Sequence, residues 1–148
     1  MSIQARLFDA LKASMTARDT SRTATLRMIK SAIGYAQIEK KLDPLPDPDV
    51  LAVLQKEAKK RKDAADEFER GGRAELAANE RAELKIIEEF LPANLTPDEL
   101  EALVRAAIAE SQATSRKDMG TVMKIAQSKA AGRADGKSIS ALVARLLP

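Results

Sequence analysis

The segment from residue 116 to residue 147, RKDMGTVMKIAQSKAAGRADGKSISALVARLL, has the pattern of two short helices joined by a glycine-marked turn. Helical i, i+3, i+4, i+7 spacing predicts a first helix over about 118–130, with an apolar face of Met119, Val122, Met123 and Ala126. Gly132 is suited to end it, because glycine adopts left-handed backbone geometry without steric strain. Asp135 can then cap a second helix. That helix would bury Ile139, Leu142, Val143 and Leu146.

This end of the chain is also strongly basic. Residues 113–148 contain seven basic side chains against only Asp118 and Asp135, a net charge of +5. The basic residues are Arg116, Lys117, Lys124, Lys129, Arg133, Lys137 and Arg145. A small module with an apolar interior and a basic exterior can face a sugar–phosphate backbone. The alternative interpretation is a solvated helical surface with an uneven charge distribution.

Short motifs here are similar to the signatures of the GatB/YqeY family, which includes the tail domain of the B subunit of the aspartyl/glutamyl-tRNA amidotransferase. They are KDMGTVM at 117–123 and GRADG at 132–136. Three earlier segments resemble the free-standing YqeY-like branch: Arg61-Lys62-Asp63 with Phe68, Gly72-Arg73 with Leu76 and Glu80, and Phe90-Leu91-Pro92. The resemblance covers essentially the whole chain. It implies a helical N-terminal domain followed by a tail-like C-terminal domain.

The resemblance also implies a partner, tRNA or another folded RNA. The expected RNA-binding residues are Arg116, Lys117, Lys124, Lys129, Arg133 and Lys137. The expected structural residues of the motifs are Asp118, Gly120, Met123, Gly132, Asp135 and Gly136. The amidotransferase tail more usually has an Asn-Pro pair where this sequence has Asp135-Gly136, which places the chain on the YqeY-like side. A scarcity of aromatic residues favours recognition of folded RNA by shape over stacking on single-stranded bases.

Composition supports an all-α protein. Apolar residues make up 45% of the 148 residues and aromatic residues 3%, so the core must be aliphatic. Alanine, leucine and charged residues dominate, which favours helix. The chain has no cysteine, no long apolar run and no hydrophobic signal core at MSIQARLF, so we expect a cytoplasmic protein.

Periodicity and breaker residues predict five further helices before residue 116, about seven helices in all and no strand. Their expected ranges are 2–18, 21–41, 48–70, 73–90 and 97–111. Met15 and Leu76 are among the residues expected to face the core. We expect Thr20 or Ser21 to cap the second helix, and Pro92 marks a boundary between domains at 1–94 and 95–148.

Asp47 is an expected cap of the third helix, and Asp118 of the sixth.

Two other helix positions each have two interpretations. The run KEAKKRK at 56–62 is either a solvated helix end with Glu–Lys pairs or a second phosphate contact, in which Lys59 with Arg61 or Lys62 points outward. Gly120 either permits close contact with another helix or lets an RNA backbone approach.

The residue types present do not suit catalysis. Histidine and cysteine are absent, so the commonest general base and the strongest nucleophile are missing. No Gly-x-Ser-x-Gly elbow, phosphate-binding loop, zinc spacing or calcium loop occurs, and we expect no metal and no cofactor. The favoured hypothesis is a non-catalytic tRNA-binding accessory protein. The alternatives are a protein-interaction module acting through the acidic helices at 73–111, and an accessory component of glutamine-dependent carbon–nitrogen ligation.

Overall fold

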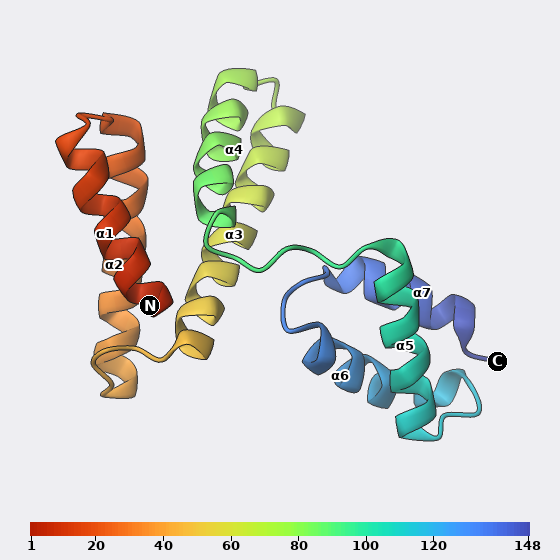
Figure 1. Cartoon of the computed structure of the whole chain (residues 1–148). Coiled ribbons are helices and arrows are strands. Elements are labelled where there is room, and N and C mark those ends of the chain that lie inside the picture. Colours follow the sequence, from red (N-terminus) through yellow and green to blue (C-terminus); the bar gives the residue numbers. More distant parts are fainter. The chain divides into compact units, whose positions relative to one another are not determined.

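The computed structural model describes residues 1–148, and its regular structure is entirely helical (Figure 1). This confirms the predicted all-α class with seven α-helices. The α-helices are α1 (Ile3–Thr16), α2 (Thr20–Lys40), α3 (Asp47–Arg70), α4 (Ala74–Glu88), α5 (Pro97–Ser111), α6 (Met119–Ala130) and α7 (Gly136–Leu146); a single 3₁₀ turn, η1, covers Arg116–Asp118. The chain forms two compact units, unit 1 at Met1–Leu91 and unit 2 at Pro92–Pro148.

Unit 1 consists of two helical hairpins, α1 with α2 and α3 with α4 (Figure 1). Its core is aliphatic and includes Leu7, Leu26, Ile29, Ile33, Val50, Leu54 and Ile87. Two residues that we expected in the core lie on the surface, because Met15 is 49% and Leu76 39% exposed. At each place the adjacent residue is buried instead: Ser14, before Met15, is 3% exposed, and Ala77, after Leu76, is 0% exposed. The core-facing side of the helix is therefore one position away from the residue that we predicted.

Buried polar contacts fix the ends of the unit 1 helices. The Gln4 side-chain oxygen accepts the backbone N–H of Leu45 at 2.9 Å and the Gln37 amide at 3.3 Å. Asp47 does not cap α3 as predicted. Its carboxylate instead accepts the backbone N–H of Ile3 at 2.9 Å, tying the start of α1 to the start of α3. The cap of α2 is Asp19, which accepts the N–H of Arg22, and not Thr20 or Ser21.

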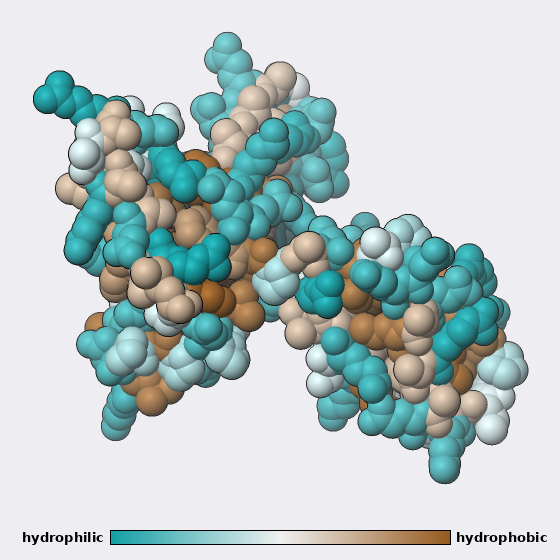
Figure 2. All heavy atoms as spheres, in the orientation of Figure 1, coloured by the Kyte–Doolittle hydropathy of each residue, from teal (hydrophilic) through white to brown (hydrophobic).

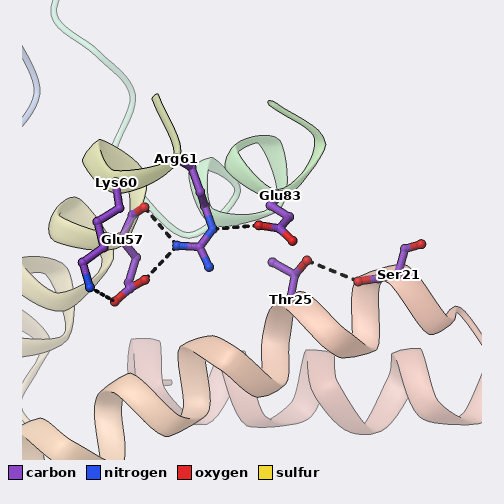
Figure 3. A network of polar contacts seen from close by, with 6 residues as sticks. All are labelled: Ser21, Thr25, Glu57, Lys60, Arg61 and Glu83. Atoms are coloured by element: carbon purple, nitrogen blue, oxygen red, sulfur yellow. Dashed lines mark hydrogen bonds and ion pairs between the residues drawn. The ribbon is translucent and has the colours of Figure 1, made fainter. Parts of the chain in front are cut away.

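Arg61 lies inside unit 1, which excludes the outward orientation that the phosphate-contact interpretation allowed for it (Figure 3). It is 4% exposed. Its Nη1 donates to the Glu57 carboxylate at 2.7 Å and to the Glu57 backbone carbonyl at 3.1 Å. Its Nε lies 3.2 Å from a Glu83 oxygen on α4, within ion-pair range but outside hydrogen-bond geometry. Arg61 therefore joins α3 to α4 and is not available to phosphate.

The remaining charges of the 56–62 run lie on the surface of α3. Lys59 pairs with Asp63 at 3.1 Å, and Lys60 pairs with Glu57 at 3.5 Å. These contacts match the solvated-helix interpretation for the exposed lysines. A further ion pair, Arg22 with Glu89 at 2.7 Å, connects α2 to the residue after α4, and the hydrogen bond that Arg22 donates to the Glu89 carboxylate raises the pKa of Arg22.

Unit 2 is a three-helix arrangement of α5, α6 and α7 around a small core. The core contains Val104, Ala107, Val122, Ala126, Ala130, Ile139, Val143 and Leu147. Met123 packs against it while remaining partly exposed. Between α6 and α7 the chain turns through Ala131 and Gly132, whose φ values of 48° and 80° are both left-handed, as predicted for Gly132.

The predicted caps of α5 and α7 are confirmed. Thr96 accepts the N–H of Glu99 at 3.2 Å, and the Glu99 carboxylate accepts the N–H of Thr96 at 3.0 Å. Asp135 accepts the N–H of Ser138 at 2.7 Å. Each carboxylate also lies at the positive end of the helix dipole, which adds stability.

Hydrophilic residues cover most of the face of each unit that Figure 2 shows, and apolar residues come to the surface mainly near the middle of each. None of the helices combines the length and the apolar character that crossing a bilayer requires.

Candidate nucleic-acid interface

The side of α6 that faces away from the core of unit 2 carries an exposed lysine. Val122, Ala126 and Ala130 form the buried side of α6, and Lys124 lies about halfway round the helix from them. Gln127 is one turn further along on the same side as Lys124. A Cβ added at Gly136, the first residue of α7, would lie 3.8 Å from the Gln127 side-chain amide. The start of α7 is therefore beside Gln127.

This contact brings a second lysine to the same place. Lys137 follows Gly136 in the chain and is exposed, as is Lys124, one turn before Gln127 on α6. Neither lysine forms an ion pair. We call the surface made by Gly120, Lys124, Gln127, Gly136 and Lys137 the α6 outer face.

Two further exposed cations directly precede α6. Arg116 and Lys117 belong to the 3₁₀ turn η1, and neither forms an ion pair. The turn is held by Ser115, whose hydroxyl accepts the N–H of Lys117, and by Asp118, whose carboxylate accepts the N–H of Thr114 at 3.0 Å. Asp118 thus stabilises the turn before α6 and forms no side-chain cap for α6 itself, which corrects the prediction.

The other two predicted cations form contacts within unit 2. Lys129 pairs with Glu110 of α5 at 2.9 Å. The Arg133 Nε donates to the carbonyl of Ala93 at 2.9 Å, and the Arg133 carbonyl accepts the N–H of Leu95 at 2.8 Å. Arg133 therefore holds the segment before α5 against the α6–α7 turn. Of the six predicted residues, Arg116, Lys117, Lys124 and Lys137 are exposed without an acidic partner.

Gly120 does not make the close helix contact that we considered for it. It is exposed, and a Cβ placed on it would meet nothing within 4 Å. Since it lies one turn before Lys124, the backbone is uncovered next to a cation. A glycine in this position costs helix stability without improving the packing of the protein.

The start of α7 is a poor anion site. The Asp135 carboxylate already occupies it through the N–H of Ser138. A phosphate at that helix end would meet a negative charge, so Lys137 contributes here through its own side chain.

A shallow hollow of about 490 Å³ lies beside α5 and α7, lined by Leu100, Leu142, Glu101, Arg145 and neighbours. Within it, Arg145 lies 3.8 Å from Glu101, which also pairs with Arg105 at 2.8 Å. No three acidic residues cluster as a metal site would require.

Many carboxylates of the acidic helices already have partners. Glu83 contacts Arg61 and Glu89 contacts Arg22 in unit 1. In unit 2, Glu101 and Glu110 pair with Arg105 and Lys129. These pairs neutralise part of the acidic charge at 73–111, whereas Glu75, Glu80, Glu88 and Asp98 form no ion pair.

Sequence reasoning overlooked Gln127, which lies one turn after Lys124 and beside the start of α7. The only available signal was its position on α6, three residues after Lys124. Its neighbour on α7, Gly136, depends on how α6 and α7 cross, which the sequence alone does not show.

Comparison with known proteins agrees with the sequence motifs. The family described as Yqey-like protein matches residues 4–147. An uncharacterized protein of Schizosaccharomyces pombe, C22F3.15, is 36% identical over 91 residues, which cover 62% of this chain and 73% of the yeast protein. The match extends through both units, from α1 to the end of α7. The chain therefore belongs to the family of YqeY-like proteins.

Proposed function

We propose that this protein is a non-catalytic accessory protein that binds tRNA, related in role to the tail of the tRNA-dependent amidotransferase. The observation that carries the proposal is the set of unpaired cations on unit 2. Lys124 lies one turn before Gln127 on α6, Lys137 follows the residue of α7 that lies beside Gln127, and Arg116 and Lys117 precede α6. Cations without acidic partners can release counterions from RNA on binding, which is the main source of affinity for a phosphate backbone.

The uncovered backbone at Gly120 supports contact with a bulky, rigid ligand. A ribose–phosphate chain can approach α6 closely there, because no side chain projects between Lys124 and the start of the helix at this position. Recognition would depend on shape and charge, since aromatic residues form only 3% of the chain.

Titration of the full chain with bulk tRNA, followed by fluorescence anisotropy at several salt concentrations, tests the proposal. With about four phosphate contacts, the logarithm of the binding constant should fall with the logarithm of salt with a slope of about −3 to −4. Affinity should then drop on the order of 100-fold between about 50 and 200 mM salt. Absence of binding at about 50 mM salt, where such contacts are strongest, would exclude tRNA as the ligand.

The two alternative functions predict different results in parallel assays. A protein-interaction module would recover a stoichiometric protein partner and no RNA. A catalytic component of carbon–nitrogen ligation would show glutaminase or transamidase turnover with the purified chain, for which the structure provides no histidine or cysteine.

A further inference from the structure

The charge of unit 1 is divided unevenly between its two hairpins. Residues 1–46, which include α1 and α2, contain eight basic and four acidic residues, a net charge of +4. Residues 47–91, which include α3 and α4, contain nine basic and twelve acidic residues, a net charge of −3. In the basic hairpin only Arg22 and Lys40 form ion pairs, so the other six of its eight cations have no acidic partner.

Three of these six cations come together where α1 lies beside α2. The Lys30 ammonium is 5.3 Å from the centre of the Phe8 ring, which places this edge of α2 next to Phe8 of α1. Lys12 is one turn after Phe8, and Arg27 is one turn before Lys30, so each lies on the same side of its helix as the contact. All three cations are exposed. We call the surface made by Phe8, Lys12, Arg27, Lys30 and Gly34 the α1–α2 edge.

The register of the hairpin brings Lys12 and Arg27 to the same level. The hydroxyls of Ser14 and Thr23 are 2.8 Å apart, nearer to the turn between α1 and α2 than the cation–π contact is. Lys12 and Arg27 each lie between these two contacts, one on either helix. The three cations therefore form a compact group and are not strung out along the hairpin.

The acidic residues of the hairpin lie away from this edge. Asp9 projects about 100° further round α1 than its neighbour Phe8, and Glu39 lies on the side of α2 opposite the edge. The other two accept hydrogen bonds within the hairpin, one at the cap of α2 and one in the loop after it: Asp19 and Asp43. The α1–α2 edge therefore keeps its positive charge.

Gly34, one turn after Lys30, leaves helix backbone uncovered at the same edge. A Cβ placed there would meet nothing within 4 Å, so close packing does not account for the glycine, although it costs about 0.5–1 kcal/mol of helix stability. Unit 2 has the same combination, because Gly120 is equally open and lies one turn before Lys124. Each unit thus places a cation beside bare backbone, which a sugar–phosphate chain can approach closely.

We propose that the α1–α2 edge is a second RNA-binding surface, through which unit 1 contacts the phosphate backbone of the same tRNA that binds unit 2. The inference rests on the proposed function and extends it to unit 1. Only a short segment separates α4 of unit 1 from α5 of unit 2, so an RNA held by one unit is present at high effective concentration for the other. Three cations without acidic partners add to the release of counterions on binding.

Titration of the full chain with bulk tRNA at several salt concentrations tests the second surface. The four cations of unit 2 alone give a slope of log affinity against log salt of about −3 to −4, whereas seven phosphate contacts give about −6. We expect the steeper slope for the wild type. Removing the three cations of the edge, with Lys12→Ala, Arg27→Ala and Lys30→Ala, should make the slope shallower by about 3 and weaken binding.

A matched control removes the same charge from the other hairpin. Lys59, Lys60 and Arg81 pair with acidic residues there, and their triple alanine variant should bind tRNA with nearly the wild-type slope. Far-UV circular dichroism checks that both triple variants are folded. Equal loss of slope in the two variants would overturn the proposal, because the effect would then come from total charge and not from the α1–α2 edge.

The double variant Lys124→Ala with Lys137→Ala separates this inference from the proposed interface on unit 2. If the double variant lowers the slope and the triple variant of the edge does not, the second surface is wrong and the interface on unit 2 stands. If only the triple variant of the edge lowers the slope, the RNA binds unit 1 and the interface on unit 2 is wrong. A wild-type chain that binds no tRNA at about 50 mM salt would overturn both, even if it binds vesicles that contain phosphatidylserine.

Discussion

Replacing Arg61 by alanine should be among the most destabilising single substitutions in unit 1. The change removes a cation that is 4% exposed and leaves the side chains of Glu57 and Glu83, 15% and 32% exposed, without it. Removing one partner of a buried ion pair typically costs about 3–5 kcal/mol, because the remaining charge stays desolvated and uncompensated. Against a total stability of about 5–15 kcal/mol, this is a large fraction.

A surface ion pair on the same helix provides the matched control. Lys59 pairs with Asp63, but their side chains are 77% and 66% exposed. Lys59→Ala should cost no more than about 0.5 kcal/mol, because water screens such a pair. The triple variant Arg61→Met, Glu57→Gln and Glu83→Gln should be more stable than Arg61→Ala and recover much of its lost free energy of unfolding. Methionine fills the space of the buried arginine stem, and the two glutamines remove the carboxylate charges that Arg61→Ala leaves without a partner.

Urea unfolding of the full chain measures these differences. Far-UV circular dichroism follows both units, whereas Tyr35 is the only tyrosine and there is no tryptophan, so its fluorescence reports on unit 1. The free energy of unfolding from the Tyr35 signal should fall for Arg61→Ala far more than for Lys59→Ala. Equal, small losses for the two variants would refute the structural role of Arg61.

Three further changes test separate features. Gly120→Ala should raise the stability of unit 2 by about 0.5–1 kcal/mol in thermal or urea unfolding, because the added methyl group meets nothing and glycine disfavours helix; it should also weaken tRNA binding if the bare backbone receives the ligand. Asp135→Ala should destabilise unit 2 by about 0.5–2 kcal/mol through loss of the cap on Ser138, whereas Asp135→Asn should retain most of it. Binding of tRNA should change little between about pH 6 and pH 8, because the chain has no histidine, the side chain that ordinarily titrates in this range; a strong pH dependence in anisotropy titrations would show that other groups take part.

Local sequence signals predicted the helices well because their ends depend on local chemistry. Thr96 with Glu99, and Asp135 with Ser138, form their caps within four residues, so neighbouring sequence is sufficient. The left-handed Gly132 is likewise a local requirement. Fold class follows from such signals together with the helical spacing of apolar residues.

Two of the errors occur where a side chain depends on a distant element. Asp47 bonds to Ile3, and Arg61 contacts Glu83, contacts that no local rule anticipates. Arg61 stands among lysines and resembles a solvated charge. Its spacing of three residues from buried Ala58 and four from buried Ala65 was the signal that could have placed it inside.

The candidate site was predicted in its residue types and only partly in its geometry. Charge counting identified six cations but could not separate Lys129, which pairs with Glu110, from Lys124, which has no such partner. Both lie on α6, five residues apart, and only the position of α5 distinguishes them. For the same reason Gln127 became visible only through its contact with α7.

The most direct measurement of the proposed role compares the salt dependence of tRNA binding in two double variants that remove equal charge from unit 2. Lys124→Ala with Lys137→Ala removes two unpaired cations, and Lys129→Ala with Arg105→Ala removes two that pair with Glu110 and Glu101. The first should reduce the slope of log affinity against log salt by about 2, roughly one for each lost phosphate contact, and the second should change it little. Equal slopes for the two variants would show that the α6 outer face is not where the RNA binds.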